Sequence, residues 1–434
     1  MERPSRRGLL LPGAVFLAFA AVFLWQGRPT MTSWPERSRL ASVESLVERA
    51  TFRIDGSSLA VSTKDKVRIQ GHYYSDKPPL LQVLSAPAYW VLHQFGRSLD
   101  TSACPGPQCA YRPLTFVMVG LPSALLLGLF AGFARKQLGA AATALAWTAC
   151  LGAATVFWPY SLVFSNHVPA AIALLLAFAL VPPAGEDPGS RWPLLAGAFA
   201  GLAAGFDLLA ALPALALGVL VAVRSRPAAR WFGFGMLVVT SVSVVADLMV
   251  CGNPLPPYFL PNGYRYPGSP FVAGFQPPKD LLVSVVRGTI GAQGVFSHNP
   301  IVLVGVAGIL ELLRTRKHPF RGHAIAAGVG MLAFAACAFL RTKGDGGQAY
   351  GSRYFVSIVP LACAFGPWAG GRPRSRLVLG AISLAAAVGF ISAARGARDP
   401  WKAVPPPLYL DVAASNHELR LCNGLAETCW PADP

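Results

Sequence analysis

Long apolar runs separated by short polar connections make up most of the sequence. Eleven of them approach the length of about 20 residues that a helix needs to cross a bilayer. They lie at about 8–25, 114–133, 140–157, 165–182, 192–206, 209–223, 231–250, 296–313, 323–340, 355–369 and 377–394. This pattern predicts an all-α polytopic membrane protein with about 11 transmembrane helices, in which residues 1–394 form a single transmembrane domain.

Two polar stretches interrupt these runs, and a third follows them. Residues 27–112 form a long loop after the first run, and a second loop covers 251–295. Inside the first loop, the apolar stretch 78–95 contains two early prolines and a histidine, so we expect a helix lying along the membrane interface. Residues 395–434 form a C-terminal tail that is too short for an enzymatic domain.

The composition agrees with a membrane protein. Of 434 residues, 53% are hydrophobic and 13% are charged, whereas about 25% are charged in soluble proteins. These values argue against a cytosolic enzyme and exclude a disordered chain and a small disulfide-stapled scaffold. The net charge of +17 would suggest a nucleic-acid partner on a soluble protein. Here we expect no nucleic acid, because basic residues also mark the cytoplasmic loops of membrane proteins.

The basic residues indicate an orientation. With a cytoplasmic N-terminus and alternating spans, the inside carries 16 basic residues and the short outer loops after the second span carry six. The inner set is Arg3, Arg6, Arg7, Arg135, Lys136, Arg191, Arg224, Arg226, Arg230, Arg314, Arg316, Lys317, Arg321, Arg372, Arg374 and Arg376. Merging 192–206 and 209–223 into one helix would place the later basic loops outside, so we predict two helices. Residues 27–112, 251–295 and 395–434 are then extracytoplasmic.

Two cysteine pairs lie in the predicted outer segments. Cys104 and Cys109 are in the first loop, and Cys422 and Cys429 are in the tail. Disulfides persist in oxidising compartments, so each pair is a disulfide candidate. A zinc site made from the two pairs lacks the usual C-x2-C spacing.

Candidate chemistry gathers in the first loop. The segment 72–79 reads HYYSDKPP and places an acid and an ammonium side by side at the start of the interfacial helix. A helix start presents free N–H groups to anions, and a lysine ammonium is suited to phosphate. We therefore expect an anion site at headgroup depth. The loop carboxylates that could act as a base are Glu36, Asp55, Asp65 and Asp76.

Polar residues also begin two later spans. Asn166 and His167 begin the run 165–182, Arg353 and Tyr354 precede the run 355–369, and Asp207 lies at a tight connection. Ionisable groups at membrane depth are costly unless they are solvated or paired, so each is a functional candidate.

These residues resemble those of the GT-C glycosyltransferase superfamily, in particular bacterial protein-mannosyltransferases and aminoarabinose transferases. The best match is the element Tyr74-Ser75-Asp76-Lys77-Pro78 within GHYYSDKPPLLQVLSAPAYW. WPYSLVFSNHVPAA, CGNPLPPYF, GVFSHNP and YGSRYFVSIVPL add weaker support. The resemblance implies a GT-C-like fold. It also implies an enzyme that transfers a sugar from a polyprenyl-phosphate donor to a glycan, lipid or protein acceptor, with inversion of configuration at the anomeric carbon. It also implies the bacterial cytoplasmic membrane, with the active site on the extracytoplasmic face.

The resemblance also implies roles for individual residues. The base of such enzymes is an acid in a D-E-x-R-Y setting after the first span. The stretch here is Glu36-Arg37-Ser38-Arg39-Leu40, in which Glu36 replaces the aspartate and Leu40 the aromatic. The motif lysine is Lys77, which is implied to hold the carrier phosphate, with Arg353 as a second contact and Mg2+ or Mn2+ as a possible metal. Further candidate substrate contacts are Arg39, His72, Tyr74, Asn166, His167 and Tyr354.

Two other functions remain open at this point. A transporter or flippase for a lipid-linked substrate is also polytopic, although transporters place ionisable groups near the midplane and contain repeat-related halves. The replacement of aspartate by Glu36 leaves a catalytically silent scaffold as the other alternative.

Overall fold

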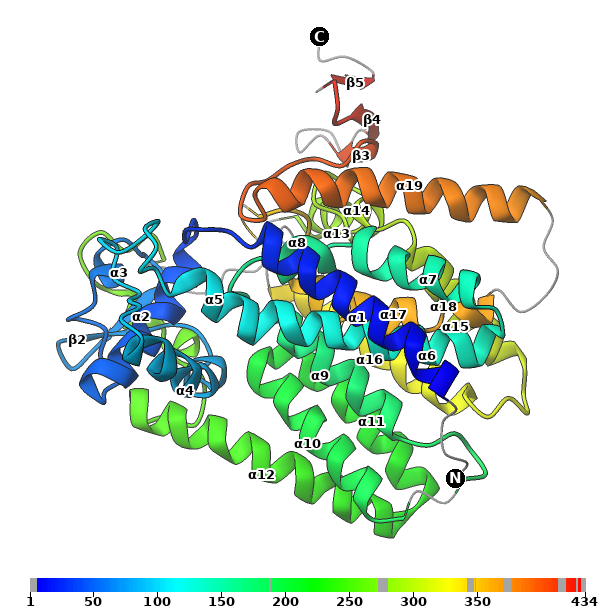
Figure 1. Ribbon diagram of the computed structural model, residues 1–434, viewed down its shortest axis with the longest axis horizontal. Coiled ribbons are helices and arrows are strands. Elements are labelled where there is room, and N and C mark those ends of the chain that lie inside the picture. The colour runs from blue at the N-terminus through cyan, green and yellow to red at the C-terminus, as the bar shows by residue number, and fades with distance from the viewer. Residues whose placement is uncertain are drawn as a thin grey trace.

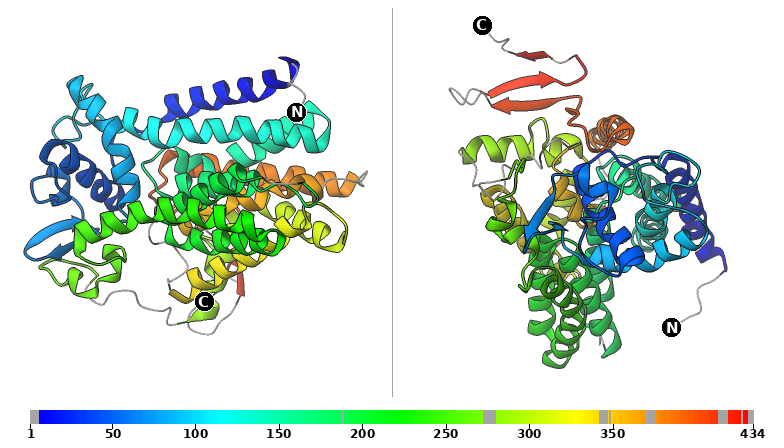
Figure 2. Two further views of the ribbon diagram at one scale, coloured as in Figure 1. Left: turned by 90° about the horizontal axis from the view of Figure 1, so that it is seen from below. Right: turned by 90° about the vertical axis from the view of Figure 1, so that its left-hand side faces the viewer.

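A computed structural model describes residues 6–186, 189–271, 280–341, 347, 349–369, 376–412, 419–426 and 428–430. Most of these residues are helical, which confirms the predicted helical membrane architecture. The first loop forms a separate layer at one end of the helices, and the tail projects from α19 (Figure 1). Two further views show the same division (Figure 2).

Helices coincide with the predicted apolar runs. The second run forms one continuous helix made of α5 (Tyr111–Thr115), the π-helical turn η1 (Phe116–Gly120) and α6 (Leu121–Leu138). The other runs form α1 (Arg6–Gln26), α7 (Ala141–Ala153), α9 (His167–Leu180), α10 (Arg191–Phe206), α11 (Ala211–Arg224), α12 (Arg226–Cys251), α15 (Val302–Arg314), α16 (Arg321–Arg341), α17 (Val359–Ala364), α18 (Gly366–Ala369) and α19 (Arg376–Arg398). The shorter connecting helices are α8 (Phe157–Ser161), η2 (Leu208–Ala210), η3 (Pro257–Phe259), η4 (Pro261–Tyr264), α13 (Leu281–Thr289), α14 (Val295–His298) and η5 (Arg353–Ser357).

Several helices are long and apolar enough to span a bilayer, so the chain is a multi-pass membrane protein. Within the described residues there are four such helices: Tyr111–Leu138, Arg226–Cys251, Arg321–Leu340 and Leu379–Arg398. Five shorter apolar helices accompany them: Leu10–Gln26, Ala141–Ala153, His167–Leu180, Leu208–Arg224 and Val359–Ala369. The count of 11 spans stays a prediction.

The run 355–369 is broken into three pieces, η5, α17 and α18, because Pro360 and Pro367 cannot donate the backbone hydrogen bonds of a continuous helix.

The first loop contains three helices and a hairpin. They are α2 (Trp34–Arg49), α3 (Ser58–Val61), β1 (Lys66–Ile69), β2 (His72–Ser75) and α4 (Leu80–Gln94). The hairpin turns at Gln70-Gly71, both with positive φ, as a type I′ turn requires. The all-α prediction misses this hairpin because its strands have only four residues each.

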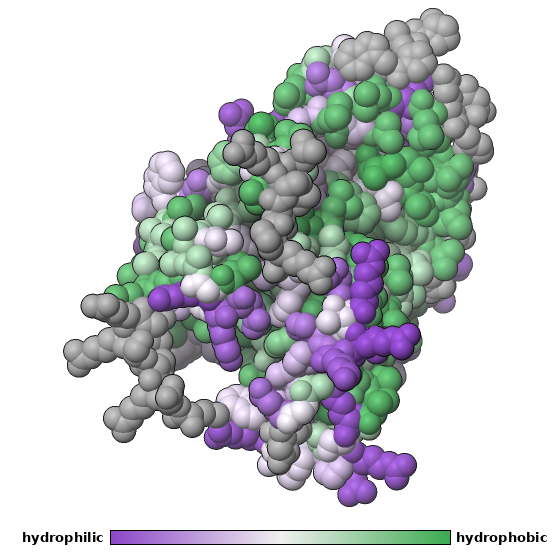
Figure 3. Space-filling view, turned by 90° about the vertical axis from the view of Figure 1, so that its right-hand side faces the viewer, coloured by the Kyte–Doolittle hydropathy of each residue, from purple (hydrophilic) through white to green (hydrophobic). Residues whose placement is uncertain are grey.

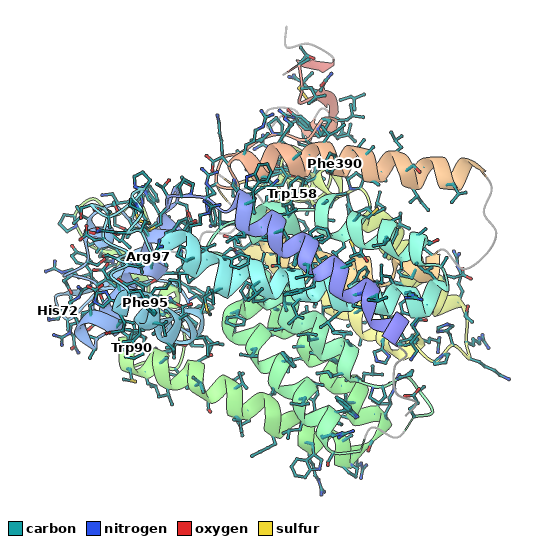
Figure 4. The ribbon with its side chains drawn as sticks, viewed as in Figure 1. His72, Trp90, Phe95, Arg97, Trp158 and Phe390 are labelled. Atoms are coloured by element: carbon teal, nitrogen blue, oxygen red, sulfur yellow. A yellow bond between two sulfur atoms is a disulfide. The ribbon has the colours of Figure 1, made fainter. Side chains whose placement is uncertain are left out.

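Helix α4 falls on the predicted interfacial segment. Its exposed side chains include Leu84, Trp90 and Val91, and the next residue after the helix, Phe95, is 81% exposed. Trp90 and Phe95 both belong to the first-loop layer (Figure 4). An exposed apolar helix face of this kind fits a position along the membrane interface.

A glycine stripe on α10 brings α10 and α12 together. Gly197, Gly201 and Gly205 are spaced four apart, and a Cβ at Gly197 would lie 1.9 Å from the carbonyl oxygen of Phe232. On the opposite helix, a Cβ at Gly235 would lie 2.1 Å from the carbonyl oxygen of Leu194. Small residues at this spacing allow membrane helices to pack backbone against backbone. The α10–α12 packing therefore holds the end of α10 at a fixed position beside α4.

Helices α10 and α11 are separate, as predicted. The chain breaks at Asp207, whose side chain accepts a hydrogen bond of 3.2 Å from the backbone N–H of Leu209. The short helix η2 follows, and α11 then packs against α10 and α12. This break places Asp207 at the end of the helices that faces the first loop.

Basic side chains mark the opposite helix ends. Helix α6 ends near Arg135 and Lys136, α11 ends at Arg224 and α15 ends at Arg314. Figure 3 views the molecule from the side opposite the first loop and shows hydrophilic side chains gathered beside a broad apolar flank. Which of the two ends faces the cytoplasm stays a prediction.

The tail forms a small antiparallel sheet that the all-α prediction also misses. Its strands are β3 (Tyr409–Val412), β4 (Leu419–Asn423) and β5 (Thr428–Trp430), in the order β3-β4-β5. Cys422 and Cys429 are opposite each other on β4 and β5 and form a disulfide. A second disulfide joins Cys104 to Cys109 in the first loop. Helix α19 extends to Arg398, slightly beyond the predicted start of the tail.

Candidate functional site

Lys77 lies between two buried acids in the turn from β2 to α4. Its ammonium nitrogen is 2.8 Å from an Asp65 carboxylate oxygen and 3.1 Å from one of Asp76. Tyr264 of η4 donates a hydrogen bond of 3.0 Å to Asp76. Burial raises the pKa of Asp76, and the Lys77 charge opposes this rise. The three charged groups form one network, the Lys77 cluster.

The backbone at Lys77 is fixed against α2. The Ser75 and Ser38 hydroxyl oxygens are 2.6 Å apart, and the backbone N–H of Lys77 donates to Ser75 Oγ over 3.2 Å. Gln82 in the first turn of α4 donates to the Lys77 carbonyl over 3.5 Å. These bonds hold the Lys77 side chain at the junction of the loop and the helices.

Arg39 of α2 lies beside this cluster. It donates to the Asn166 side-chain oxygen over 2.5 Å and to the Pro35 carbonyl over 3.1 Å, while its Nε is buried without a partner. Burial and the positive charge of Arg353 lower the pKa of Arg39 to about 10, and Asp65 and Asp76 oppose this shift. Arg39 therefore shares one electrostatic environment with Arg353 and with both acids of the Lys77 cluster.

Arg353, the first residue of η5, is the third cation of the site. Its guanidinium carbon lies 5.5 Å from the centre of the Tyr354 ring, within cation–π range. Its Nε, like that of Arg39, is buried without a partner. Leaving a buried donor unpaired costs about 1–3 kcal/mol, so both guanidinium groups are suited to a ligand that accepts hydrogen bonds.

Glu36 is enclosed by hydrogen bonds. Its side chain accepts bonds from the backbone N–H groups of Thr32, Ser33 and Phe164, from the Ser33 hydroxyl and from the Tyr111 hydroxyl. It is 0% exposed, and with Ser33 it forms the capping box of α2. Burial raises the pKa of Glu36, and these hydrogen bonds oppose the rise. The geometry thus makes Glu36 a residue that joins α2, α5 and the segment before α9.

Asp55 and His72 pair away from the Lys77 cluster. Asp55 lies 3.4 Å from the His72 ring and accepts the backbone N–H of Tyr73 over 3.1 Å. Both side chains of the pair are about 40% exposed (39% and 42%), and His72 lies at the outer edge of the first-loop layer (Figure 4). Tyr74, two residues on, lies on the same face of the hairpin as His72. The structure therefore does not bring Asp55 and His72 to the predicted phosphate site.

His167 forms a buried network with Asp207 and Ser357, here called the His167 network. The His167 Nδ1 lies 2.8 Å from Asp207 Oδ2, and the Ser357 hydroxyl donates to the same oxygen over 2.6 Å. The ring also lies edge-on to Tyr354, with centroids 6.1 Å apart. Sequence reasoning selects Asp207 as an acid at a membrane edge, but no local signal marks Ser357 as its partner.

Three further polar residues that the structure describes are Tyr258 of η3, Asp247 of α12 and Gln82 of α4. Burial raises the pKa of Tyr258, and the negative charges of Asp207, Asp247 and Asp76 add to this shift, which places Tyr258 among these acids. Oδ1 of Asp247 and Oε1 of Gln82 are buried without hydrogen-bond partners. The motif CGNPLPPYF contains Tyr258, but its sequence does not reveal these neighbours.

The remaining candidates have structural partners. Both ring nitrogens of His298 lie near backbone carbonyls, at 3.2 Å from Gly294 and 3.1 Å from Val404. Trp158 stacks on Phe390 with ring centroids 5.8 Å apart and so joins α8 to α19 (Figure 4). In the part of the chain that the structure describes, no group of three or more His, Cys, Asp or Glu side chains could hold a metal ion.

The fold is similar to that in the crystal structure of ArnT from Cupriavidus metallidurans bound to undecaprenyl phosphate. The TM-score is 0.53 at 20% sequence identity, over 88% of this chain and 64% of the ArnT chain. The chain thus spans slightly less than two thirds of the length of ArnT. This likeness confirms the predicted GT-C-like fold. No protein-family model matches the sequence, and no curated protein sequence matches it.

Proposed function

We propose that the protein is a glycosyltransferase that takes a sugar from a polyprenyl-phosphate carrier. The acceptor is an envelope glycan, lipid or protein on the extracytoplasmic face of the bacterial cytoplasmic membrane. The observation that carries the proposal is that Asp65 pairs with Lys77 and interacts electrostatically with both Arg39 and Arg353. The fold shared with ArnT, which was crystallised with undecaprenyl phosphate, supports it.

The donor phosphate is the ligand that best suits these cations. Two of them have a buried Nε without a partner, and phosphate oxygens accept charge-assisted hydrogen bonds. Lys77 already faces two acids, so phosphate binding there is easiest when Asp76 carries a proton. The raised pKa of Asp76 favours that proton.

The same groups favour the chemical step. As the bond between the anomeric carbon and the phosphate oxygen breaks, negative charge grows on the polyprenyl phosphate. Fixed cations at the leaving oxygen stabilise that charge more than they stabilise the ground state. The buried acceptors on Gln82 and Asp247 are suited to sugar hydroxyl groups. Residues 251–295 and the tail 395–434 are proposed to shape the acceptor side.

A deletion strain tests this function. Lipid and glycan profiling should reveal a polyprenyl-phosphate sugar that accumulates and a glycan that is lost, and the wild-type gene should restore both. The protein purified in nanodiscs should then release polyprenyl phosphate from that lipid. Lys77→Met should abolish transfer, whereas Arg68→Ala is the control, because Arg68 is an exposed cation on the hairpin that precedes Lys77. Donor movement across vesicles without transfer would instead identify a flippase.

A further inference from the structure

We propose that His167, positioned by Asp207, is the general base that deprotonates the acceptor hydroxyl. This inference rests on the proposed glycosyl transfer. The acceptor oxygen bonds to the anomeric carbon while the bond from that carbon to the phosphate oxygen breaks. The bonding electrons leave with polyprenyl phosphate, and the acceptor proton moves to His167 Nε2. Asp207 and Ser357 are positioning residues that do not touch the substrate.

The hydrogen bonds of the His167 network determine which ring nitrogen can accept a proton. An ionised carboxylate only accepts hydrogen bonds, so Nδ1, 2.8 Å from Asp207, carries the ring hydrogen. The neutral ring then has its lone pair on Nε2. A base oriented by a carboxylate on its other nitrogen is the arrangement that general-base catalysis requires.

Asp207 is itself fixed from three directions. Ser357 donates to Oδ2 over 2.6 Å, and the backbone N–H of Leu209 donates to Oδ1 over 3.2 Å. His167, Asp207 and Ser357 are 8%, 7% and 0% exposed. The three side chains come from α9, from the break before η2 and from η5, so the ring is held by separate parts of the fold.

The ring also lies next to the cations that are proposed to hold the donor. Arg39 bonds to Asn166, the residue before His167, and Tyr354 contacts the ring edge-on. Arg353 and Arg39 both act electrostatically on His167. The charged and titratable groups around the ring are therefore Asp207, Arg39, Arg353 and Tyr354, with Tyr258 near Asp207.

The loop acids have other partners. Glu36 accepts hydrogen bonds on both of its oxygens, Asp65 and Asp76 pair with Lys77, and Asp55 lies at the exposed outer edge. A base must have an acceptor atom available for the substrate proton. Among the predicted site residues that the structure describes, His167 has such an atom beside the cations.

The pH dependence of kcat/KM for purified variants tests the assignment. In the wild type, activity should fall at low pH, because a protonated His167 ring cannot accept the proton of the acceptor hydroxyl. His167→Gln should lose about 100-fold or more and should lose the acidic limb. Asp207→Asn should lower the rate and move the acidic limb to lower pH, because the carboxylate stabilises the protonated ring. Ser357→Ala should lower the rate by a smaller factor, because Asp207 keeps its contact with His167.

The control is His323→Gln. His323 is also buried, with Nε2 2.9 Å from the Val181 carbonyl at the other end of α9, so it reports the cost of losing a buried histidine. It should keep the wild-type pH profile. Thermal unfolding of each variant separates loss of the base from loss of the fold.

Two outcomes overturn the assignment. A His167→Gln enzyme with a rate near that of the wild type means that another group is the base. If His167→Gln instead removes a fall in activity at high pH, the wild-type ring must be protonated to work, and it acts as a cation that binds the donor phosphate. Failure of the proposed function is distinct, because the wild type would then release no polyprenyl phosphate at any pH.

Discussion

Lys77 lies 2.8 Å from Asp65 and 3.1 Å from Asp76, so one ammonium group pairs with two buried acids. The sequence places Asp76 and Lys77 side by side, whereas Asp65 reaches them only because the β1–β2 hairpin folds back. The cluster therefore carries an excess negative charge unless one acid is protonated or a further cation approaches. Arg39 and Arg353 are the nearby cations that act on Asp65.

Lys77→Met should abolish sugar transfer and destabilise the protein by about 3 kcal/mol. Removing one partner from a buried ion pair costs about 3–5 kcal/mol. We expect the lower value because the Lys77 side chain is 18% exposed. The double variant Asp76→Asn/Lys77→Met restores the net charge of the cluster. It should recover part of the thermal stability but no transfer activity. Recovery of activity would mean that Lys77 serves only to neutralise Asp76.

The stability of the folded protein should fall as the pH rises through the titration of Asp76. Burial raises the pKa of this carboxyl above its usual 3.8, so the folded protein binds a proton that the unfolded chain has already lost. Each pKa unit of difference changes the free energy of unfolding by about 1.4 kcal/mol. Thermal unfolding of the protein between pH 4 and 7 measures this.

Asp76→Asn should flatten that pH dependence, since the amide does not titrate. The slope should not vanish, because burial also raises the pKa of Glu36 and Glu44. Asp55→Asn is the matched control, because Asp55 is 39% exposed. An Asp76→Asn protein with the wild-type slope would contradict this account of the cluster.

Hydropathy was sufficient to locate the helices, because an apolar run of span length leaves few alternatives in a bilayer. It also located Asp207, where two helices of the predicted map meet. The hairpin at Gln70-Gly71 was missed because its strands are too short for a clear alternating pattern. The contact between Asp207 and Ser357, 150 positions apart, depends on how α9, α10 and η5 pack, which no local pattern encodes.

Gly235→Leu should separate α10 from α12 and lower both stability and transfer. Even a Cβ at this position would lie 2.1 Å from the Leu194 carbonyl oxygen, so the helices must move apart. Because Asp207 directly follows the last residue of α10, the movement should also disturb the His167 network. Gly233→Leu, on the same helix, is the control, because a Cβ at Gly233 would meet nothing from the neighbouring elements within 4 Å. Equal melting temperatures and transfer rates for the two variants would refute the close packing.

Glu36→Gln should lower the melting temperature but keep the rate of the folded enzyme within about tenfold of the wild type. Ser33 and Tyr111 donate to different oxygens of Glu36, so the single amide oxygen of Gln can serve only one of these two sides and the NH2 group faces the donors of the other. A general base contributes about 10²–10⁴-fold, so a loss of that size would assign the base to Glu36 instead of His167. Glu44→Gln is the matched control, because Glu44 is a buried acid on the same helix that accepts a bond from Ser57. Rates per folded enzyme, measured beside the melting temperatures of both variants, distinguish a joining residue from a base.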